Sequence, residues 1–362
     1  MLESSPRSSR RLLVTGGAGF IGSNFAHAWC QQYPTDTVTV LDALTYAGTF
    51  ESLRPLAASR AITFVHGDIT DRACVAQVLE SAQIDTVVHF AAESHVDRSI
   101  ADPEAFLRTN VMGTLTLLNA VRHAWCAHGV WTRGVRFHHV SSDEVYGSLA
   151  SDEPPFHEAA PYAPSSPYAA SKASADHLVR AWMRTYGLPA TISNCSNNYG
   201  PRQFPEKLIP LMIVNALRGV PLPIYGDGLQ VRDWLYVDDH CRAIDLMLHA
   251  DITGETFNVG GRAEHTNLDI VSQLCARIDA AFDADPSLGT RFPNCPAVAG
   301  RSCTTLMTHV LDRLGHDRRY ALDTTKIANA LGFAPQESLA TGLQRTVAWY
   351  LDNESWWRPL LP

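Results

Sequence analysis

The sequence lacks the features of several broad protein classes. No stretch reaches the roughly 20 apolar residues that span a bilayer, and the polar start MLESSPRSSRR lacks the apolar run of about 7–15 residues found in secretion signals. Positive charge is also scarce: 29 Lys and Arg face 37 Asp and Glu, so the net charge of −8 does not suit a nucleic-acid partner. We therefore expect a soluble, cytoplasmic protein with no membrane or nucleic-acid partner, and a disordered tail at residues 1–10.

A cysteine framework is missing as well. The eight cysteines include no C-x-x-C pair, and the two in the loop near 284–304 have no metal-binding partners at useful spacing. We expect reduced, mostly buried thiols and no metal site. The thiols are Cys30, Cys74, Cys126, Cys195, Cys241, Cys275, Cys295 and Cys303.

The chain of 362 residues is long enough for two domains, and its first half alternates short apolar runs with helical patterns. This alternation is typical of repeated strand–helix–strand units in a parallel sheet, an α/β fold. Strands are expected at 11–17, 37–42, 61–68, 85–92, 135–142 and 189–196, and helices at 21–32, 72–82, 104–128 and 168–186. After Tyr199, stretches rich in proline and glycine favour an irregular segment. A strand at 256–261, a helix at 268–282 and a loop near 284–304 follow.

The stretch VTGGAGFIGS contains a dinucleotide-binding pattern. Gly17, Gly19 and Gly22 satisfy G-x-G-x-x-G between a strand and a helix, and Gly16 assists the tight turn. Asp42 lies 20 residues beyond Gly22, where a carboxylate can bind a ribose 2′-hydroxyl, and no arginine follows it to accept a 2′-phosphate. NAD is therefore favoured over NADP. The alternative is a glycine-rich turn without a ligand.

Two further strand ends support a nucleotide site. Asp68 ends one strand, and the small residues Ala91 and Ala92 end the next. Asp68 could instead cap the following helix. We expect a doubly wound, Rossmann-type domain at 11–199 with returning segments at about 230–262. A smaller, mixed α/β region for the substrate is expected at 200–229 and 263–350.

Tyr168 and Lys172 form the candidate reacting pair. They lie at i and i+4 of one helix, so both project from one face. A lysine ammonium favours a nearby phenolate, which would make Tyr168 a base for a hydroxyl proton. Ser142, at a strand end, is the expected third partner. A solvated helix face is the alternative for such a pair.

These residues together resemble a known family. The glycine turn, Asp42, the serines of SSDEVYG and the Y-x-x-x-K pair are similar to those of extended short-chain dehydrogenase/reductases acting on nucleotide sugars. LTYAG, AAESHVDRSI, SSDEVYG, CSNNYGPRQFPEKLIPL and YGDGLQVRDWLYVDDH resemble the dTDP-glucose 4,6-dehydratases within that group. The resemblance runs from about Arg11 to Phe333.

The resemblance implies NAD-dependent removal of water from dTDP-glucose. Tyr168, with Lys172 and Ser142, would take the proton from the sugar 4-hydroxyl as carbon 4 gives hydride to NAD. Glu144 would then remove the proton on carbon 5 while Asp143 protonates the departing 6-hydroxyl. Both carboxylates can reach one sugar only if the chain turns at 142–144, because successive residues of a strand point to opposite faces.

The resemblance also supplies the remaining binding residues. The implied cofactor set is Gly16, Gly19, Phe20, Ile21, Gly22, Asp42, Leu44, Thr45, Asp68, Ile69, Ala91, Ala92, Thr109, Tyr168, Lys172 and Asn198. The implied nucleotide-sugar set is Ser94, Asn197, Lys207, Leu208, Pro223, Ile224, Tyr225, Arg232, Asn267, Arg313 and His316. A structural Arg–Asp pair is the alternative for Arg232, and a loop histidine with a local partner is the alternative for His316.

Several departures and alternatives stay open. Ser142 stands where many relatives carry threonine, and Leu314 stands where proline is frequent. A nucleotide-sugar epimerase or decarboxylase would leave Asp143 and Glu144 idle, and a regulatory NAD-binding module would not need the five reacting residues. Uridine differs from thymidine by one methyl group, which is worth only about 1–3 kcal/mol in a hydrophobic pocket. A homodimer through the helices at 104–128 and 168–186 is expected from the family, with Leu178, Ala181 and Trp182 outermost.

Overall fold

The computed structural model describes residues 9–361, which form two compact units. The first unit holds the chain up to Ser141 together with Ser171–Ser193 and Met247–Thr256. The second holds Ser142–Ala170, Asn194–Leu246 and the chain from Phe257 on. The chain thus passes between the units several times. The expected division into cofactor-binding and substrate-binding regions concerns ligands and stays a prediction.

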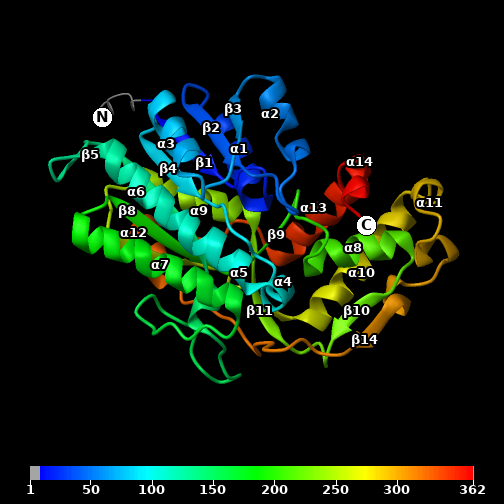
Figure 1. The fold of residues 1–362 in the computed structure, drawn as a ribbon. Coiled ribbons are helices and arrows are strands. Elements are labelled where there is room, and N and C mark those ends of the chain that lie inside the picture. Colours follow the sequence, from blue (N-terminus) through cyan, green and yellow to red (C-terminus); the bar gives the residue numbers. More distant parts are fainter. Residues whose placement is uncertain (1–8, 362) are drawn as a thin grey trace, which may run out of the picture. The chain divides into compact units, whose positions relative to one another are not determined.

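The first unit is built on a seven-stranded sheet, shown with its helices in Figure 1. Five strands pair in parallel in the order β7, β4, β1, β2 and β3, as expected for repeated strand–helix–strand units. In order across the sheet, the strands are β12 (Glu255–Val259), β8 (Ala190–Cys195), β7 (Arg136–Ser142), β4 (Thr86–His89), β1 (Arg11–Thr15), β2 (Thr37–Asp42) and β3 (Ile62–His66). All seven strands expected from the sequence are confirmed.

Helices flank this sheet because alternate strand residues turn apolar side chains to opposite faces. Leu13 packs in a core with side chains of α3 (Arg72–Ser81), α6 (Thr114–Trp125) and α7 (Pro167–Tyr186). Leu12 and Val14 are fully buried on the other face. Helix α1 (Phe20–Gln32) follows the glycine turn. The expected helices at 21–32, 72–82 and 168–186 are confirmed within two residues.

The expected helix at 104–128 is only partly right. The structure has α5 (Pro103–Phe106), a π-helical segment η2 (Leu107–Gly113) and α6, and the helical stretch ends at Trp125. The expected tail at residues 1–10 lies outside the described residues up to position 8. At Arg10 the expectation is wrong, because its guanidinium donates to the Thr86 hydroxyl at 3.1 Å and to the Leu248 carbonyl at 2.9 Å.

The second unit has its own core, formed mainly by α8 (Leu208–Arg218), α10 (Asn267–Ala284) and α13 (Leu339–Asp352). The expectation of irregular chain after Tyr199 is wrong for α8. Pro210 occupies the first turn, where a backbone N–H has no helical partner to lose, and Gly219 ends the helix in a left-handed conformation. The loop near 284–304 also contains short helical turns at Leu288–Arg291 and Pro296–Ala299. The helix expected at 268–282 is confirmed as α10.

Two small sheets complete the second unit. β10 (Leu222–Tyr225) pairs in parallel with β14 (Met307–Val310). β11 (Val231–Tyr236) lies between β13 (Glu264–Thr266) and β9 (Asn197–Tyr199). Neither β11 nor α9 (Val237–His249), which follows it directly, was predicted from the sequence.

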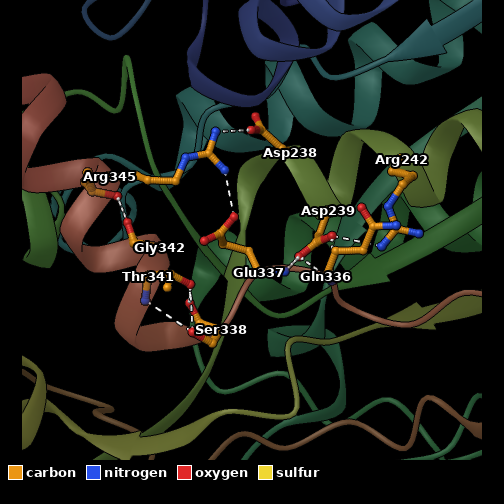
Figure 2. A network of polar contacts seen from close by, with 10 residues as sticks. Asp238, Asp239, Arg242, Gln336, Glu337, Ser338, Thr341, Gly342 and Arg345 are labelled. Atoms are coloured by element: carbon orange, nitrogen blue, oxygen red, sulfur yellow. Dashed lines mark hydrogen bonds and ion pairs between the residues drawn. The ribbon is translucent and has the colours of Figure 1, made fainter.

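A polar network joins the start of α9 to the start of α13, as Figure 2 shows. The buried Asp239 accepts the backbone N–H groups of Gln336 and Glu337 at 2.9–3.0 Å. The Arg345 guanidinium binds Glu337 at 2.7 Å and Asp238 at 3.0 Å. The network therefore fixes the chain that leads into α13.

Two classes of feature are missing from the part of the chain that the structure describes. Between residues 9 and 361, no helix combines the length and apolar character needed to cross a bilayer. Across the same span, no three His, Cys, Asp or Glu side chains are grouped closely enough to hold a metal ion.

Candidate active site

The glycine turn between β1 and α1 requires glycine for steric reasons. Gly16 has a φ of +69°, and a Cβ there would lie 2.5 Å from the backbone nitrogen of Ala91. A Cβ on Gly22 would lie 2.4 Å from the carbonyl oxygen of Gly16. The first backbone N–H groups of α1, at Phe20 and Ile21, have no preceding turn to bind, and they suit a phosphate group.

Asp42 stands at the end of β2, beside this turn. Its carboxylate accepts the backbone N–H groups of Ala18 at 2.9 Å and Leu44 at 2.8 Å. Burial raises the pKa of Asp42, and these two hydrogen bonds oppose that shift. Four lone pairs are available on a carboxylate, so two remain for a hydroxyl ligand. Leu44 takes a φ of +50°, and Thr45 follows it.

The other expected cofactor residues of the first unit follow β3 and β4 or lie on η2. Asp68 accepts the backbone N–H and the hydroxyl of Thr70 at 2.8 and 2.9 Å. It does not cap α3, because Asp71 does so through Ala73 and Cys74. Ile69 is buried, and Ala91 packs against Gly16. Ala92 and Ser94 lie between β4 and α4 (Val96–Ala101), and Thr109 lies on η2.

Lys172 is buried at the edge of a polar network that the sequence analysis missed. Its ammonium donates to the carbonyl of Val140 at 2.7 Å. One turn further along α7, the Asp176 carboxylate accepts the Ser141 hydroxyl at 2.9 Å and lies 3.2 Å from the His139 ring. Burial lowers the pKa of His139, and the charge of Lys172 lowers it further. The adjacent histidines in VRFHHVSS were the available signal, since polar side chains inside a central strand need buried partners.

The SSDEVYG stretch turns sharply at the start of the second unit. β7 ends at Ser142, and the 3₁₀-helix η3 (Asp143–Tyr146) begins at the next residue. The Ser142 hydroxyl donates to the Asp143 carboxylate at 3.2 Å and accepts the Glu144 N–H at 3.3 Å. The turn required at 142–144 is therefore confirmed.

The two carboxyl groups have different electrostatic surroundings. Burial raises the pKa of Asp143 well above its usual range, and the negative charge of Glu144 adds to the shift. Burial also raises the pKa of Glu144, but the positive charges of Lys207 and Arg232 counteract it. The Oδ2 atom of Asp143 is buried without a hydrogen-bond partner among the described residues. A proton is thus more stable on Asp143 than on Glu144.

Tyr168 departs from the sequence-based expectation. Burial raises its pKa well above the usual value, and the negative charge of Glu144 raises it further, while the Ser142 hydroxyl lowers it through a hydrogen bond. Lys172 lies one turn further along α7, but its ammonium binds the Val140 carbonyl. The net shift of the Tyr168 pKa is upward, and the expectation that the charge of Lys172 favours the phenolate stays a prediction.

Arg232 is a buried cation next to the acidic turn. Its guanidinium donates to the carbonyls of Val231 at 2.8 Å and Asp317 at 2.9 Å, and it stacks on the Tyr320 ring. Asp233 instead accepts the N–H groups of Gly261 and Ala263 at 2.9 and 2.7 Å. The structural Arg–Asp pair considered for VRDW is thus not formed. The remaining N–H groups of Arg232 suit an anionic ligand.

The remaining sugar-side residues of the second unit fall into two groups. The Arg313 guanidinium lies 4.9 Å from the centre of the Tyr225 ring, and the His316 ring binds the Asp312 carboxylate at 2.6 Å. His316 thus has the local partner that the plain alternative requires. Arg313 and His316 belong to the first group together with three residues of β10, where Pro223 and Tyr225 flank Ile224. The Ile224 side chain packs in the core of the second unit.

The second group comprises residues at the ends of elements. Lys207 precedes α8, Leu208 begins it, and Asn267 begins α10. On β9, Asn197 has a buried side-chain oxygen without a partner among the described residues. The side chain of Asn198 is held by the Ser196 carbonyl and by His240.

The comparisons with known proteins agree with one another. The family model described as GDP-mannose 4,6 dehydratase matches residues 13–346. The dTDP-glucose 4,6-dehydratase of Neisseria meningitidis serogroup B is 50% identical over 353 residues, covering 97% of this chain and 96% of the relative. That of Xanthomonas campestris pv. campestris is 51% identical over 345 residues, covering 95% and 94%.

A solved structure gives the same result. The crystal structure of the dTDP-glucose 4,6-dehydratase of Streptomyces venezuelae matches with a TM-score of 0.85 and 47% identity. The match covers 97% of this chain and 100% of that one. The chain therefore belongs to the dTDP-glucose 4,6-dehydratase family, within the short-chain dehydrogenase/reductases of Rossmann fold.

Proposed function

We propose that this protein dehydrates dTDP-glucose to dTDP-4-keto-6-deoxyglucose with NAD as its cofactor. The observation that carries the proposal is the turn of η3, which presents two adjacent carboxyl groups with unequal proton affinities. Elimination of water needs a proton donor and a proton acceptor at one sugar, and the two environments separate these roles. The close relatives carry the same activity in their names.

The first unit supplies residues that fit NAD. Gly16 and Gly22 allow the backbone of the turn to pack more closely than a Cβ would permit, and Asp42 keeps acceptor capacity for a ribose hydroxyl. The Streptomyces venezuelae relative was crystallised with NAD and dTDP. When bound, NAD accepts a hydride from the sugar and later returns it, so no external redox partner is required. Gly19, Phe20 and Ile21 would meet the pyrophosphate at the start of α1.

The oxidation step is assigned to Tyr168, Ser142 and Lys172. In our proposal Tyr168 takes the proton of the 4-hydroxyl, and Ser142 stabilises the phenolate through a hydrogen bond. Because burial and Glu144 oppose the phenolate, Tyr168 needs a nearby positive charge to act as a base. Lys172 is the buried cation one turn along α7 that can supply it.

The elimination step is assigned to the acidic turn. Glu144, with Lys207 and Arg232 favouring its charged form, removes the proton on carbon 5. Asp143 holds its proton and gives it to the departing 6-hydroxyl. Each positioned acid or base of this kind contributes about a hundred- to ten-thousand-fold in rate.

The substrate diphosphate is assigned to the cations of the second unit. Arg232 has a buried, planar guanidinium with donors to spare, and Arg313 stacks on Tyr225. A planar fork of N–H donors matches phosphate oxygens. Asn197 and Asn267, at element boundaries, are proposed to contact the nucleotide.

We infer a homodimer through η2, α6 and α7, supported by Leu107 and Met112, which are 50% and 47% exposed on η2. Ala181 is exposed, whereas Leu178 and Trp182 pack partly against their own core. We also infer a cytoplasmic location, which is consistent with eight free thiols. Light scattering with and without Met112→Glu tests the dimer.

Incubation with dTDP-glucose and analysis of the product test the main proposal. A 4-keto-6-deoxy sugar absorbs in strong base, whereas a 4-epimer does not, so the product separates dehydration from epimerisation. Parallel incubation with UDP-glucose measures the preference for thymidine. The proposal fails if the purified protein converts dTDP-glucose to an epimer or leaves it unchanged.

A further inference from the structure

The turn that carries both carboxyl groups has little internal support. η3 is four residues long and is followed by Gly147 at a φ of +88°. The contacts at its ends are long, from Gly147 N–H to the Glu144 carbonyl at 3.2 Å and from Glu144 N–H to Ser142 Oγ at 3.3 Å. Short 3₁₀ segments have poor hydrogen-bond geometry, so the orientation of this turn must be fixed from outside.

Tyr146, the last residue of η3, provides an external anchor through its side chain, in addition to the backbone bond from Ala163 N–H to the Val145 carbonyl at 3.1 Å. Its side chain is 2% exposed, and its hydroxyl donates to Asn258 Oδ1 at 2.8 Å while accepting Asn194 Nδ2 at 2.8 Å. The ring stacks on Phe156 with the ring centres 5.1 Å apart. The phenol is therefore held at its ring and at its oxygen.

The two amide partners are themselves fixed. Asn258, on β12, donates from its side chain to the Phe156 carbonyl at 2.8 Å, and its backbone N–H binds Glu158 at 2.9 Å. Asn194, on β8, also donates to the Tyr162 hydroxyl at 3.1 Å. Both asparagines are fully buried. The anchor thus rests on two strand residues, which Phe156, Glu158 and Tyr162 of the segment after η3 hold in place.

We propose that the Tyr146 hydroxyl positions the Asp143–Glu144 turn for elimination and is a determinant of that step rather than of sugar oxidation. In a helix of three residues per turn, fixing the direction of one side chain fixes the directions of the others. Asp143 and Glu144 depend on this rotation. Ser142 lies at the end of β7, and Tyr168 and Lys172 lie on α7. The directions of these three side chains therefore do not depend on the rotation of η3. This inference rests on the proposed function, since it divides that reaction into two steps.

Tyr146→Phe tests the inference, with Tyr162→Phe as the matched control. The control also removes a hydroxyl bound to Asn194, but Tyr162 lies outside η3. In single turnovers with dTDP-glucose, NADH absorbance reports oxidation, and the base-absorbing product reports elimination. We expect Tyr146→Phe to slow elimination about 10- to 100-fold, as misplacement of a catalytic group does. Oxidation should change less than elimination, so NADH should accumulate. Tyr162→Phe should leave both rates near those of the unmodified protein.

The split between steps distinguishes positioning from general damage. If Tyr146→Phe slows both steps equally, or slows neither, the inference is wrong. Should that variant fold poorly, Asn258→Ser removes the acceptor of the same hydroxyl and carries the same expectation. If the unmodified protein makes no 4-keto-6-deoxy product, the proposed function itself fails, and that result is separate from the behaviour of Tyr146→Phe.

Discussion

Asp143 and Glu144 are adjacent on one turn, yet their surroundings favour opposite protonation states. Asp143 is buried, and the charge of Glu144 further raises its pKa. Glu144 is flanked by Lys207 and Arg232, whose charges favour its ionised form. Two neighbouring carboxyl groups can divide acid and base roles only if something other than sequence position makes them unequal.

Asp143→Asn and Glu144→Gln should impair different half-steps of elimination. Each should lower the rate of product formation about a hundred- to ten-thousand-fold while NADH still forms. In deuterated water, Asp143→Asn should still exchange the carbon 5 proton of the oxidised sugar, because the base is intact. Glu144→Gln should not exchange it. Nuclear magnetic resonance of the recovered sugar measures the exchange, and the reverse pattern would exchange the two assignments.

The pH dependence of oxidation should respond to Glu144. The negative charge of Glu144 raises the pKa of Tyr168, so its removal lowers that pKa. Tyr168 acts as a base only when deprotonated, and the rate therefore rises with pH through its pKa. In Glu144→Gln this rise should move to lower pH, as measured by NADH formation in single turnovers. Glu158→Gln is the control, because Glu158 binds the Asn258 N–H and is not among the main charges acting on Tyr168. An unmoved profile in Glu144→Gln would contradict the coupling.

Gly22→Ala should damage both stability and NAD binding. Its Cβ would lie 2.4 Å from the Gly16 carbonyl oxygen, so backbone must shift, at a cost of about 1–3 kcal/mol. Gly332→Ala is the control, since Gly332 has a φ of +66° and nothing within 4 Å, and should cost only about 1 kcal/mol. Urea unfolding measures stability, and fluorescence titration measures NAD affinity. Unchanged affinity in Gly22→Ala would argue against a pyrophosphate at this turn.

The network in Figure 2 predicts unequal roles for two adjacent aspartates. Asp239 is 3% exposed and accepts two backbone N–H groups, so Asp239→Ala should lower the free energy of unfolding by about 2–4 kcal/mol. Asp238 pairs with Arg345, and both side chains are about half exposed, so Asp238→Ala should cost less than about 1 kcal/mol. Urea unfolding of the two variants compares them. Equal losses would show that the backbone contacts of Asp239 contribute little.

Local patterns were sufficient to predict the strands of the large sheet. The strands β1, β2 and β4 are short runs rich in apolar residues. β1 is followed by a glycine, β2 ends at an aspartate and β4 ends at a histidine, and such runs form strands in most tertiary contexts. α8 was missed because Pro210 and the surrounding glycines look like loop signals. Whether a proline or a glycine is compatible with a helix depends on where the first turn of that helix falls.

The electrostatics of the candidate site could not be predicted from the sequence. The pKa of Tyr168 depends on Glu144 and Cys195, which are 24 and 27 residues away in the sequence. The partners of Arg232 are backbone carbonyls and the Tyr320 ring, which no motif specifies. Burial and through-space charge come from the tertiary structure, so the sequence could suggest a phenolate base without fixing its proton affinity.

The interleaved units have a consequence for biosynthesis. The sheet of the first unit is completed at one edge by β12, which begins only at Glu255. A nascent chain released from the ribosome before that point exposes the open edge of β8, and open edges favour pairing with other chains. Folding of this enzyme during translation must therefore wait until more than two-thirds of the polypeptide has emerged, and premature termination products should be prone to aggregate.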